Sequence, residues 1–158
     1  MEQYAGFWKR FGAIIIDGII IWVLQAFVFV PILGALGLGF FNNMEDLQSG
    51  DPEAAMGMVG AIIAAAGAIW VLTMIIQVLY FTFMESSKTQ ATLGKMALGI
   101  IVTDMNGAPL NFSKALVRNL CRLLSNFTML IGYIIAAFTA KKQALHDIIA
   151  GTLVVNKK

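Results

Sequence analysis

The chain has 158 residues, of which 59% are hydrophobic and only 13% are charged. A soluble domain this short cannot hide so much apolar surface in one core, and a disordered chain has the opposite composition, with low hydrophobicity and high charge. A disulfide-stapled scaffold is excluded because the chain contains a single cysteine, Cys121. The composition therefore predicts an all-α integral membrane protein.

Two long apolar stretches predict two membrane-spanning helices. The first covers residues 11–41 and contains one acidic residue, Asp17. It is too long for a signal peptide, so we expect it to remain uncleaved. The second covers residues 54–84, and an acidic loop, residues 42–53, joins the two. Each stretch exceeds the roughly 20 residues that a membrane crossing needs.

The basic residues predict the orientation of these helices. Lys9 and Arg10 precede the first helix, the acidic loop has no Lys or Arg, and all other basic residues follow Glu85. By the positive-inside rule, the N-terminus and the segment after the second helix lie in the cytoplasm and the loop lies outside. The protein is thus expected to be a multi-pass protein of the cytoplasmic membrane.

Residues 85–122 predict a cytoplasmic segment with a small β element. Residues 98–103 are apolar and β-branched, and residues 104–107 (DMNG) are typical of a turn. Residues 152–155 also have the composition of a strand. Pairing between the two strands would require both to lie on the same side of the membrane.

An amphipathic helix is expected from Phe112, with Asn111 or Ser113 at its N-cap. Three basic residues recur at a spacing of four and so share one helical face: Lys114, Arg118 and Arg122. This pattern predicts an interfacial helix whose basic residues contact anionic lipid headgroups. The alternative is a helix whose charges are merely solvated.

Residues 123–140 predict a third membrane-embedded segment, either transmembrane or re-entrant. These 18 mainly apolar residues, interrupted by Asn126, Thr128 and Gly132, would form a helix about 27 Å long, barely enough to cross. A crossing would leave the lysines of the C-terminal piece, residues 141–158, outside, against the positive-inside rule. A re-entrant segment would keep them inside but would have to be buried in protein.

Asp17 is the most informative single residue. A carboxylate inside a membrane helix must be protonated, paired or exposed to a water-filled cavity. Arg10 lies almost two turns earlier, but helical side chains lean toward the N-terminus, so it points away from Asp17. Gln77 lies at a similar depth in the second helix and is a candidate partner; water, a proton or a bound cation are the alternatives.

His146 and Asp147 form a second candidate site. A histidine beside a carboxylate can shuttle protons, but no nucleophile or metal-ligand spacing accompanies this pair. We therefore expect no catalytic residues, no metal, no cofactor and no nucleic-acid partner. Asp147 is expected instead to cap or anchor the C-terminal piece, against Arg10 or against the face that carries Arg118 and Arg122.

Three motifs, taken together and in this order, resemble the RDD family of small bacterial membrane proteins. They are residues 4–11 (YAGFWKRF) followed by Asp17 and Gly18, residues 90–96 (QATLGKM) and residues 143–152 (QALHDIIAGT). The family is named for one arginine and two aspartates, which the resemblance matches to Arg10, Asp17 and Asp147, with Asp104 as the alternative for the last. The resemblance implies a bacterial inner-membrane protein and a single domain over residues 1–158, with transport of an unidentified ligand as the usual suggestion.

Two functions follow as hypotheses. In the first, a homo-oligomer transports an ion or small ligand, with Asp17 alternating between a proton and a monovalent cation and with Arg10 and Asp147 as an inner gate. In the second, the protein is a non-transporting scaffold that binds a partner protein or anionic membrane lipid. In the scaffold, Arg10, Asp17 and Asp147 would tie the first helix to the C-terminal piece.

Overall fold

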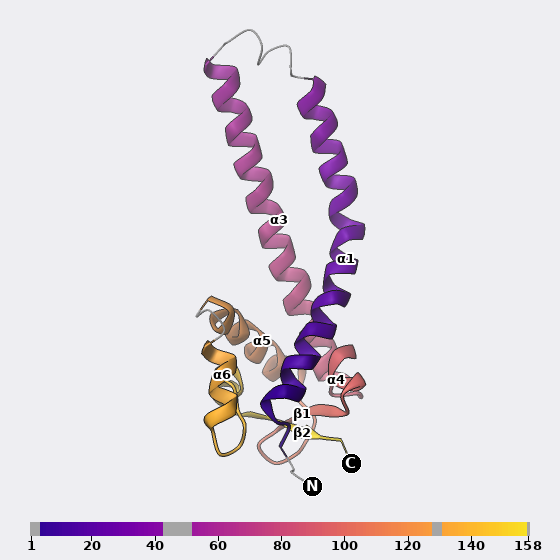
Figure 1. Cartoon of the computed structure of the whole chain (residues 1–158), viewed down its shortest axis with the longest axis vertical. Helices are drawn as coiled ribbons and strands as arrows, with labels where there is room; N and C mark the ends of the chain where they lie inside the picture. Colours follow the sequence, from indigo (N-terminus) through magenta and orange to yellow (C-terminus); the bar gives the residue numbers. More distant parts are fainter. Residues whose placement is uncertain (1–3, 43–51, 128–130, 158) are drawn as a thin grey trace. The chain divides into compact units, whose positions relative to one another are not determined.

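The computed structural model describes residues 4–42, 52–127 and 131–157 (Figure 1). In chain order its elements are α1 (Phe7–Asn42), α3 (Pro52–Ser86), α4 (Leu93–Ala97), β1 (Ile100–Asp104), α5 (Phe112–Phe127), α6 (Ile131–Phe138), α7 (Leu145–Ala150) and β2 (Thr152–Asn156). The fold is all-α with one small sheet, as the sequence predicts.

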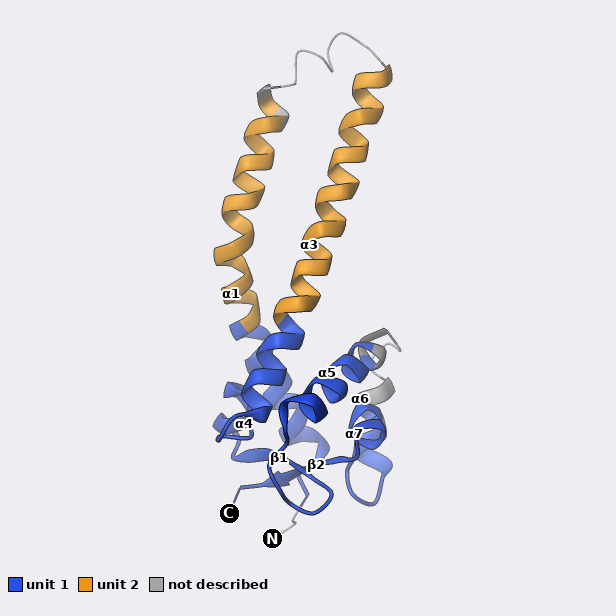
Figure 2. Ribbon diagram, turned by 180° about the vertical axis from the view of Figure 1, so that it is seen from behind, with its two compact units in different colours: residues 1–20, 77–158 blue, residues 21–76 orange. Residues whose placement is uncertain are grey.

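The chain divides into two compact units, coloured separately in Figure 2. Unit 1 comprises residues 1–20 and 77–158, and unit 2 comprises residues 21–76. Of the described elements, unit 2 contains the C-terminal part of α1 and the N-terminal part of α3. Unit 1 contains their remaining ends and all the smaller elements.

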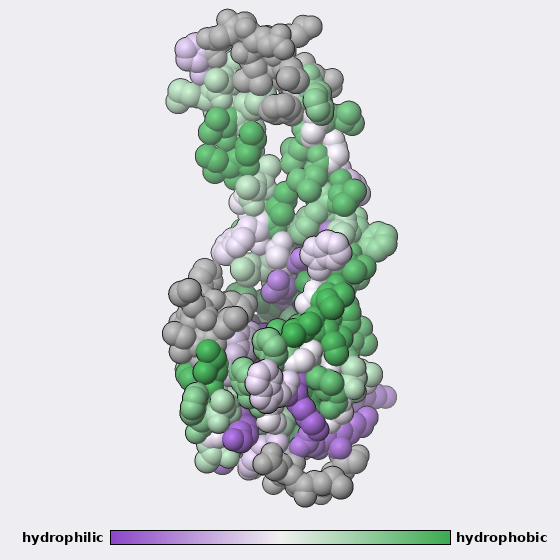
Figure 3. All heavy atoms as spheres, in the orientation of Figure 1, coloured by the Kyte–Doolittle hydropathy of each residue, from purple (hydrophilic) through white to green (hydrophobic). Residues whose placement is uncertain are grey.

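Two helices are long and apolar enough to cross a membrane, over Phe7–Gly39 and Pro52–Ser86. Almost none of either apolar stretch is buried within the protein, and green, hydrophobic side chains predominate on the face of unit 2 seen in Figure 3. Membrane-spanning helices have this character because lipid replaces a protein core around them. The two predicted membrane helices are confirmed. Most of the predicted acidic loop, residues 43–51, lies outside the described residues.

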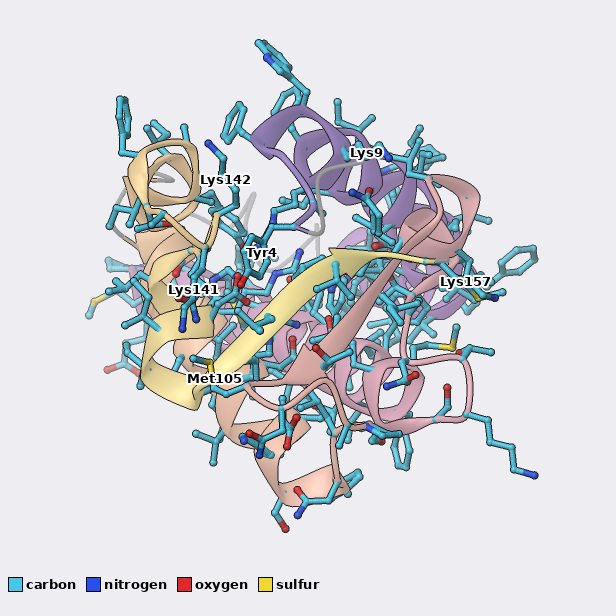
Figure 4. All side chains as sticks on the ribbon, turned by 90° about the horizontal axis from the view of Figure 1, so that it is seen from below. Tyr4, Lys9, Met105, Lys141, Lys142 and Lys157 are labelled. Atoms are coloured by element: carbon cyan, nitrogen blue, oxygen red, sulfur yellow. The ribbon has the colours of Figure 1, made fainter. Side chains whose placement is uncertain are left out.

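The two strands pair with each other, as expected. β1 and β2 are antiparallel, with Ile101 opposite Val155, and Tyr4 forms an isolated bridge to the same Val155. Figure 4 shows Tyr4 beside β2. The start of the chain, the segment that follows α3 and the C-terminal strand are therefore held together in unit 1.

The described residues of the predicted third membrane segment belong mainly to two elements, α5 and α6. Its first residues complete α5, and α6 begins at Ile131 after residues that the structure does not describe. The eight residues of α6 extend only about 12 Å, too short to cross a bilayer. Because β1 and β2 pair in one sheet, the two ends of the chain between them lie together in unit 1. Whether residues 123–140 are transmembrane or re-entrant stays a prediction.

Unit 1 has a small apolar core and many buried polar groups. The apolar cluster consists of Ala5, Ala13, Ile100, Val102, Leu110, Ala115 and Val154. Most of the largest fully buried side chains are instead polar or charged, with Arg118 and Glu85 among them. The interior of unit 1 is therefore organised around ionic contacts, which form the candidate site.

Candidate functional site

Asp17 is held by three neutral donors. The Thr92 hydroxyl donates to Asp17 Oδ2 at 2.5 Å, and the Gly94 backbone N–H and the Tyr80 hydroxyl donate to Oδ1 at 2.8 and 3.0 Å. The Asp17 side chain is almost completely buried. Thr92 is also the N-cap of α4, where its hydroxyl accepts from Lys95 N. The carboxylate therefore joins α1 to the start of α4.

Gly94 makes this contact sterically possible. A Cβ atom at this position would lie 2.3 Å from the Ala13 carbonyl oxygen and 2.9 Å from Asp17 Cγ. Only glycine lets the α4 backbone approach α1 this closely. The middle sequence motif, residues 90–96, thus has a physical explanation, because its Thr92 and Gly94 donate hydrogen bonds to Asp17.

Asp147 lies in a different, strongly charged environment. Arg10 Nη1 donates to Asp147 Oδ2, and Arg118 donates to Oδ1 from both Nε and Nη2, at 3.0 and 2.7 Å. The Ala144 N–H donates to Oδ2 at 3.1 Å, which caps α7. We expected Asp147 to cap or anchor the C-terminal piece, against Arg10 or against the face with Arg118 and Arg122. In the structure it does both, and its partners are Arg10 and Arg118.

Glu85 extends this charged network to α4. Its carboxylate accepts from Lys95 Nζ on Oε1 and from Arg118 Nη1 and Asn119 Nδ2 on Oε2, the last two at 2.5 and 3.0 Å. Sequence reasoning missed both Glu85 and Lys95. Glu85 stands at the end of a long apolar run, where a charge usually marks a solvated helix end. Lys95 belongs to the motif that carries the family resemblance, and that was the one available signal.

We call this set of five residues the ionic network: Arg10, Glu85, Lys95, Arg118 and Asp147. All five side chains are buried. Burial opposes the charge of Arg118, but Glu85 and Asp147 outweigh it and raise the pKa of the guanidinium. Burial also opposes the charge of Asp147, but Arg118 and its other cationic neighbours hold the pKa of this carboxyl well below its usual range. Burial lowers the pKa of Lys95 to about 8 despite its contact with Glu85.

The predicted basic lipid-contacting face of α5 needs correction. Arg118 is only 2% exposed and is paired within the ionic network, so it is not available to headgroups. Arg122 lies over the Phe81 ring at 3.6 Å and donates to the Tyr133 hydroxyl. Lys114 is half-buried at the start of α5, where its N–H is capped by Asn111. Spacing correctly placed the three residues on one helical face, but much of that face turns inward.

His146 is buried between a hydroxyl and a carboxylate. Ser125 Oγ lies 3.2 Å from His146 Nδ1, and Asp147 Oδ1 lies 3.5 Å from Nε2. Burial lowers the pKa of His146 to about 3 although Asp147 opposes this shift, so the ring is neutral at physiological pH. The three residue types resemble a hydrolase triad. However, Ser125 is fully buried, and both oxygens of Asp147 are taken by arginines.

Of the alternatives for the partner of Asp17, the candidate Gln77 is replaced by Tyr80, Thr92 and Gly94. Among the described residues, Gln77 is not a donor to Asp17; Tyr80, one turn later in the same helix, takes that role. Equal depth in two helices does not fix which helical face is turned toward the neighbour. No group of three or more potential metal ligands occurs among the residues that the structure describes.

The comparisons with known proteins agree with these motifs. The model of the RDD family matches residues 4–151. Two Bacillus subtilis (strain 168) proteins are similar to the chain: uncharacterized protein YxaI, 34% identical over 99% of this chain and 100% of the relative, and uncharacterized membrane protein YteJ, 32% identical over 99% of this chain and 84% of the relative. The search of solved structures gave no match. The family match and the two membrane helices together show that the chain is a membrane protein that belongs to the RDD family.

Proposed function

We propose that this chain transports a small ion or ligand across the membrane, with Asp17 as the group that exchanges a proton for a monovalent cation. One contrast carries the proposal. Three of the carboxylates that the structure describes are buried, namely Asp17, Glu85 and Asp147. Glu85 and Asp147 are each paired with two cationic side chains. In the described part of the chain, Asp17 has only neutral donors.

Neutral donors leave a carboxylate able to exchange its counter-ion. Guanidiniums fixed on each of the two oxygens, as Arg10 and Arg118 are at Asp147, occupy the positions that a cation would take. The hydroxyls of Thr92 and Tyr80 can instead rotate and offer their oxygen atoms to a cation. Carboxylate and hydroxyl oxygens are hard ligands, which suit small cations rather than soft metals.

Arg10 and Asp147 have a different role in this proposal from the inner gate that we first expected. Their contact is buried and shared with Arg118. Opening it would leave buried charges without partners, at a cost of several kcal/mol. We therefore assign Arg10 and Asp147, together with the rest of the ionic network, to the frame that holds α1 against α4 and α7.

The proposal includes an assembly and a location. Two candidate spans enclose too little space for a pathway, so several copies of the chain would surround it. The distribution of lysine and arginine supports a bacterial inner membrane with the N-terminus in the cytoplasm. A proton or monovalent cation and membrane lipid are the proposed partners. An enzymatic or nucleic-acid-binding role forms no part of the proposal.

The test is cation-driven dissipation of a pH gradient in proteoliposomes, with sodium, potassium or lithium salts added outside. We expect a response from the wild-type protein that is lost in Asp17→Asn. Asp104→Asn is the matched control, because Asp104 accepts backbone N–H groups in a turn, which an asparagine oxygen can also do. An unchanged response in folded Asp17→Asn protein would reject Asp17 as the exchanging group.

The second candidate function is the non-transporting scaffold. The ionic network favours it, because so many buried charges in mutual contact are typical of a rigid structural element. In that case wild-type proteoliposomes give no response to any of the three cations. Asp17→Asn would then lower only the thermal stability of the protein.

A further inference from the structure

Helix α5 buries its polar face and exposes its apolar face, which is the reverse of a surface helix in a soluble protein. Arg118 and Asn119 are each 2% exposed and Ser125 is fully buried, whereas Val117 and Leu120 are both 48% exposed. A surface helix in water buries its apolar face and exposes its charges. The environment outside α5 is therefore expected to be less polar than the interior that it covers.

Helix α7 repeats this inversion, and α6 adds an exposed apolar side chain. In α7, His146 and Asp147 are buried while Ile148 and Ile149 are about half exposed. In α6, Ile134 is exposed. We call the outward side chains of the three helices the inverted face: Phe112, Val117, Leu120, Ile134, Ile148 and Ile149.

The inverted face continues the surface of a membrane helix. The ring of Phe112 lies 5.4 Å from the ring of Phe83, and Phe83 is itself exposed within the candidate span of α3. Acyl chains that surround the end of α3 would therefore meet α5 without an intervening polar strip. This continuity identifies the occupant of the inverted face as lipid hydrocarbon.

The aromatic and basic residues nearby fit the same placement. The Arg122 guanidinium lies over Phe81 and donates to the Tyr133 hydroxyl. An arginine whose charge is covered by aromatic rings is typical of the zone where hydrocarbon meets headgroups. Figure 4 views unit 1 from the side of the sheet, and Lys141, Lys142 and Lys157 lie on this side. These lysines indicate that the side with the sheet faces headgroups and water.

We propose that the inverted face is a lipid-docking surface that lies among the acyl chains of one leaflet, with the ionic network enclosed behind it. Lipid thus contacts the apolar side of α5 rather than its basic side. The paired strands hold both ends of this α5–α7 layer on the same side, so the layer enters one leaflet without crossing. The proposal does not depend on transport.

The experiment is spin-label accessibility of the full chain in liposomes. Cys121 is replaced by alanine, and a nitroxide is attached to a single cysteine at Val117, Leu120 or Ile149. Lys157→Cys is the matched control, because Lys157 is exposed beside the sheet. Collision rates are measured with oxygen, which concentrates in hydrocarbon, and with a water-soluble nickel chelate. Labels at exposed positions leave the buried contacts intact, and thermal unfolding of each labelled protein verifies this.

We expect labels at the three inverted-face positions to collide several-fold more with oxygen than with the nickel chelate, and the label at Lys157 to show the reverse. A nickel preference at Val117, Leu120 and Ile149 would place this face in water and overturn the proposal. Low collision rates with both reagents would also overturn it, because the face would then be covered by protein, such as a second copy of the chain.

Discussion

The Asp17 site and the ionic network both lie in unit 1, but their buried carboxylates have different kinds of partner. The ionic network balances carboxylates with arginine and lysine, whereas Asp17 is satisfied by two hydroxyls and one backbone N–H. Cationic partners balance the charge of a buried carboxylate, whereas neutral donors satisfy only its hydrogen bonds. The comparison teaches that equally buried carboxylates can differ in the nature of their donors, and the proposed function depends on this difference.

Helix α4 connects the two sites. Gly94 binds Asp17, and the next residue, Lys95, binds Glu85. A shift of α4 that releases one contact therefore disturbs the other. If the contrast between the sites is right, substitutions in the ionic network should mainly change stability, and substitutions around Asp17 should mainly change function.

The largest effect is expected from Asp147→Asn. The change removes the negative charge that faces Arg10 and Arg118 and leaves two buried guanidiniums poorly compensated. Breaking a buried ion pair in this way costs about 3–5 kcal/mol. We expect most of the protein to be lost from the folded fraction, measured by thermal unfolding and size-exclusion chromatography in detergent.

Asp104→Asn is the control for this substitution, and we expect it to change the free energy of unfolding by less than about 0.5 kcal/mol. If Asp147→Asn were equally mild, the ionic network would not be the frame of unit 1. The contrast with the Asp17 site would then disappear.

Acid should destabilise the network through His146. Its pKa is about 3 in the folded protein and 6.5 in the unfolded chain, so below pH 6.5 the unfolded chain binds a proton that the folded protein does not. Stability is therefore complete above pH 6.5 and falls as the pH decreases toward 3. Between pH 6.5 and 4 the loss is on the order of 3 kcal/mol.

Melting temperatures measured across this range should fall less steeply in His146→Gln than in the wild type. Asp147 does not account for the difference, since its pKa is lowered from 3.8 and its loss of stability belongs to more acidic conditions. Parallel pH profiles for the two proteins would show that His146 becomes charged without cost.

Gly94→Ala tests the close approach on which the Asp17 site depends. The new methyl group would meet a backbone oxygen at 2.3 Å, so α4 must move away from α1. Overpacking of this kind costs about 2 kcal/mol, and we also expect any Asp17-dependent transport to be lost. Gly18→Ala is the matched control because nothing lies within 4 Å of its added Cβ. Equal stability and transport in the two variants would contradict the idea that the close approach of Gly94 to α1 is required at the Asp17 site.

The sequence predicted the elements of this fold better than the contacts between them. Strand composition was sufficient to locate β1 and β2 and to suggest that they could pair, and one charge in an apolar helix was sufficient to single out Asp17. The donors to Asp17 were not predictable, because Thr92 and Tyr80 are ordinary polar residues until α4 and α3 bring them to it. Arg118 was misplaced for a physical reason. Spacing fixes the face that a residue occupies, but in a membrane protein a polar face turns inward as readily as outward.

The smallest effect is expected from Tyr80→Phe, which is also the most selective test of the contrast. The substitution removes one of three neutral donors to Asp17 and the acceptor for the Leu93 N–H, a loss of about 1 kcal/mol. Tyr4→Phe is the control, because the Tyr4 hydroxyl lies outside the Asp17 site. If Asp17 is the exchanging group, cation-driven transport should decrease in Tyr80→Phe and stay unchanged in Tyr4→Phe. A lower melting temperature with unchanged transport would mean that the neutral donors, like the cations of the ionic network, only hold the helices together.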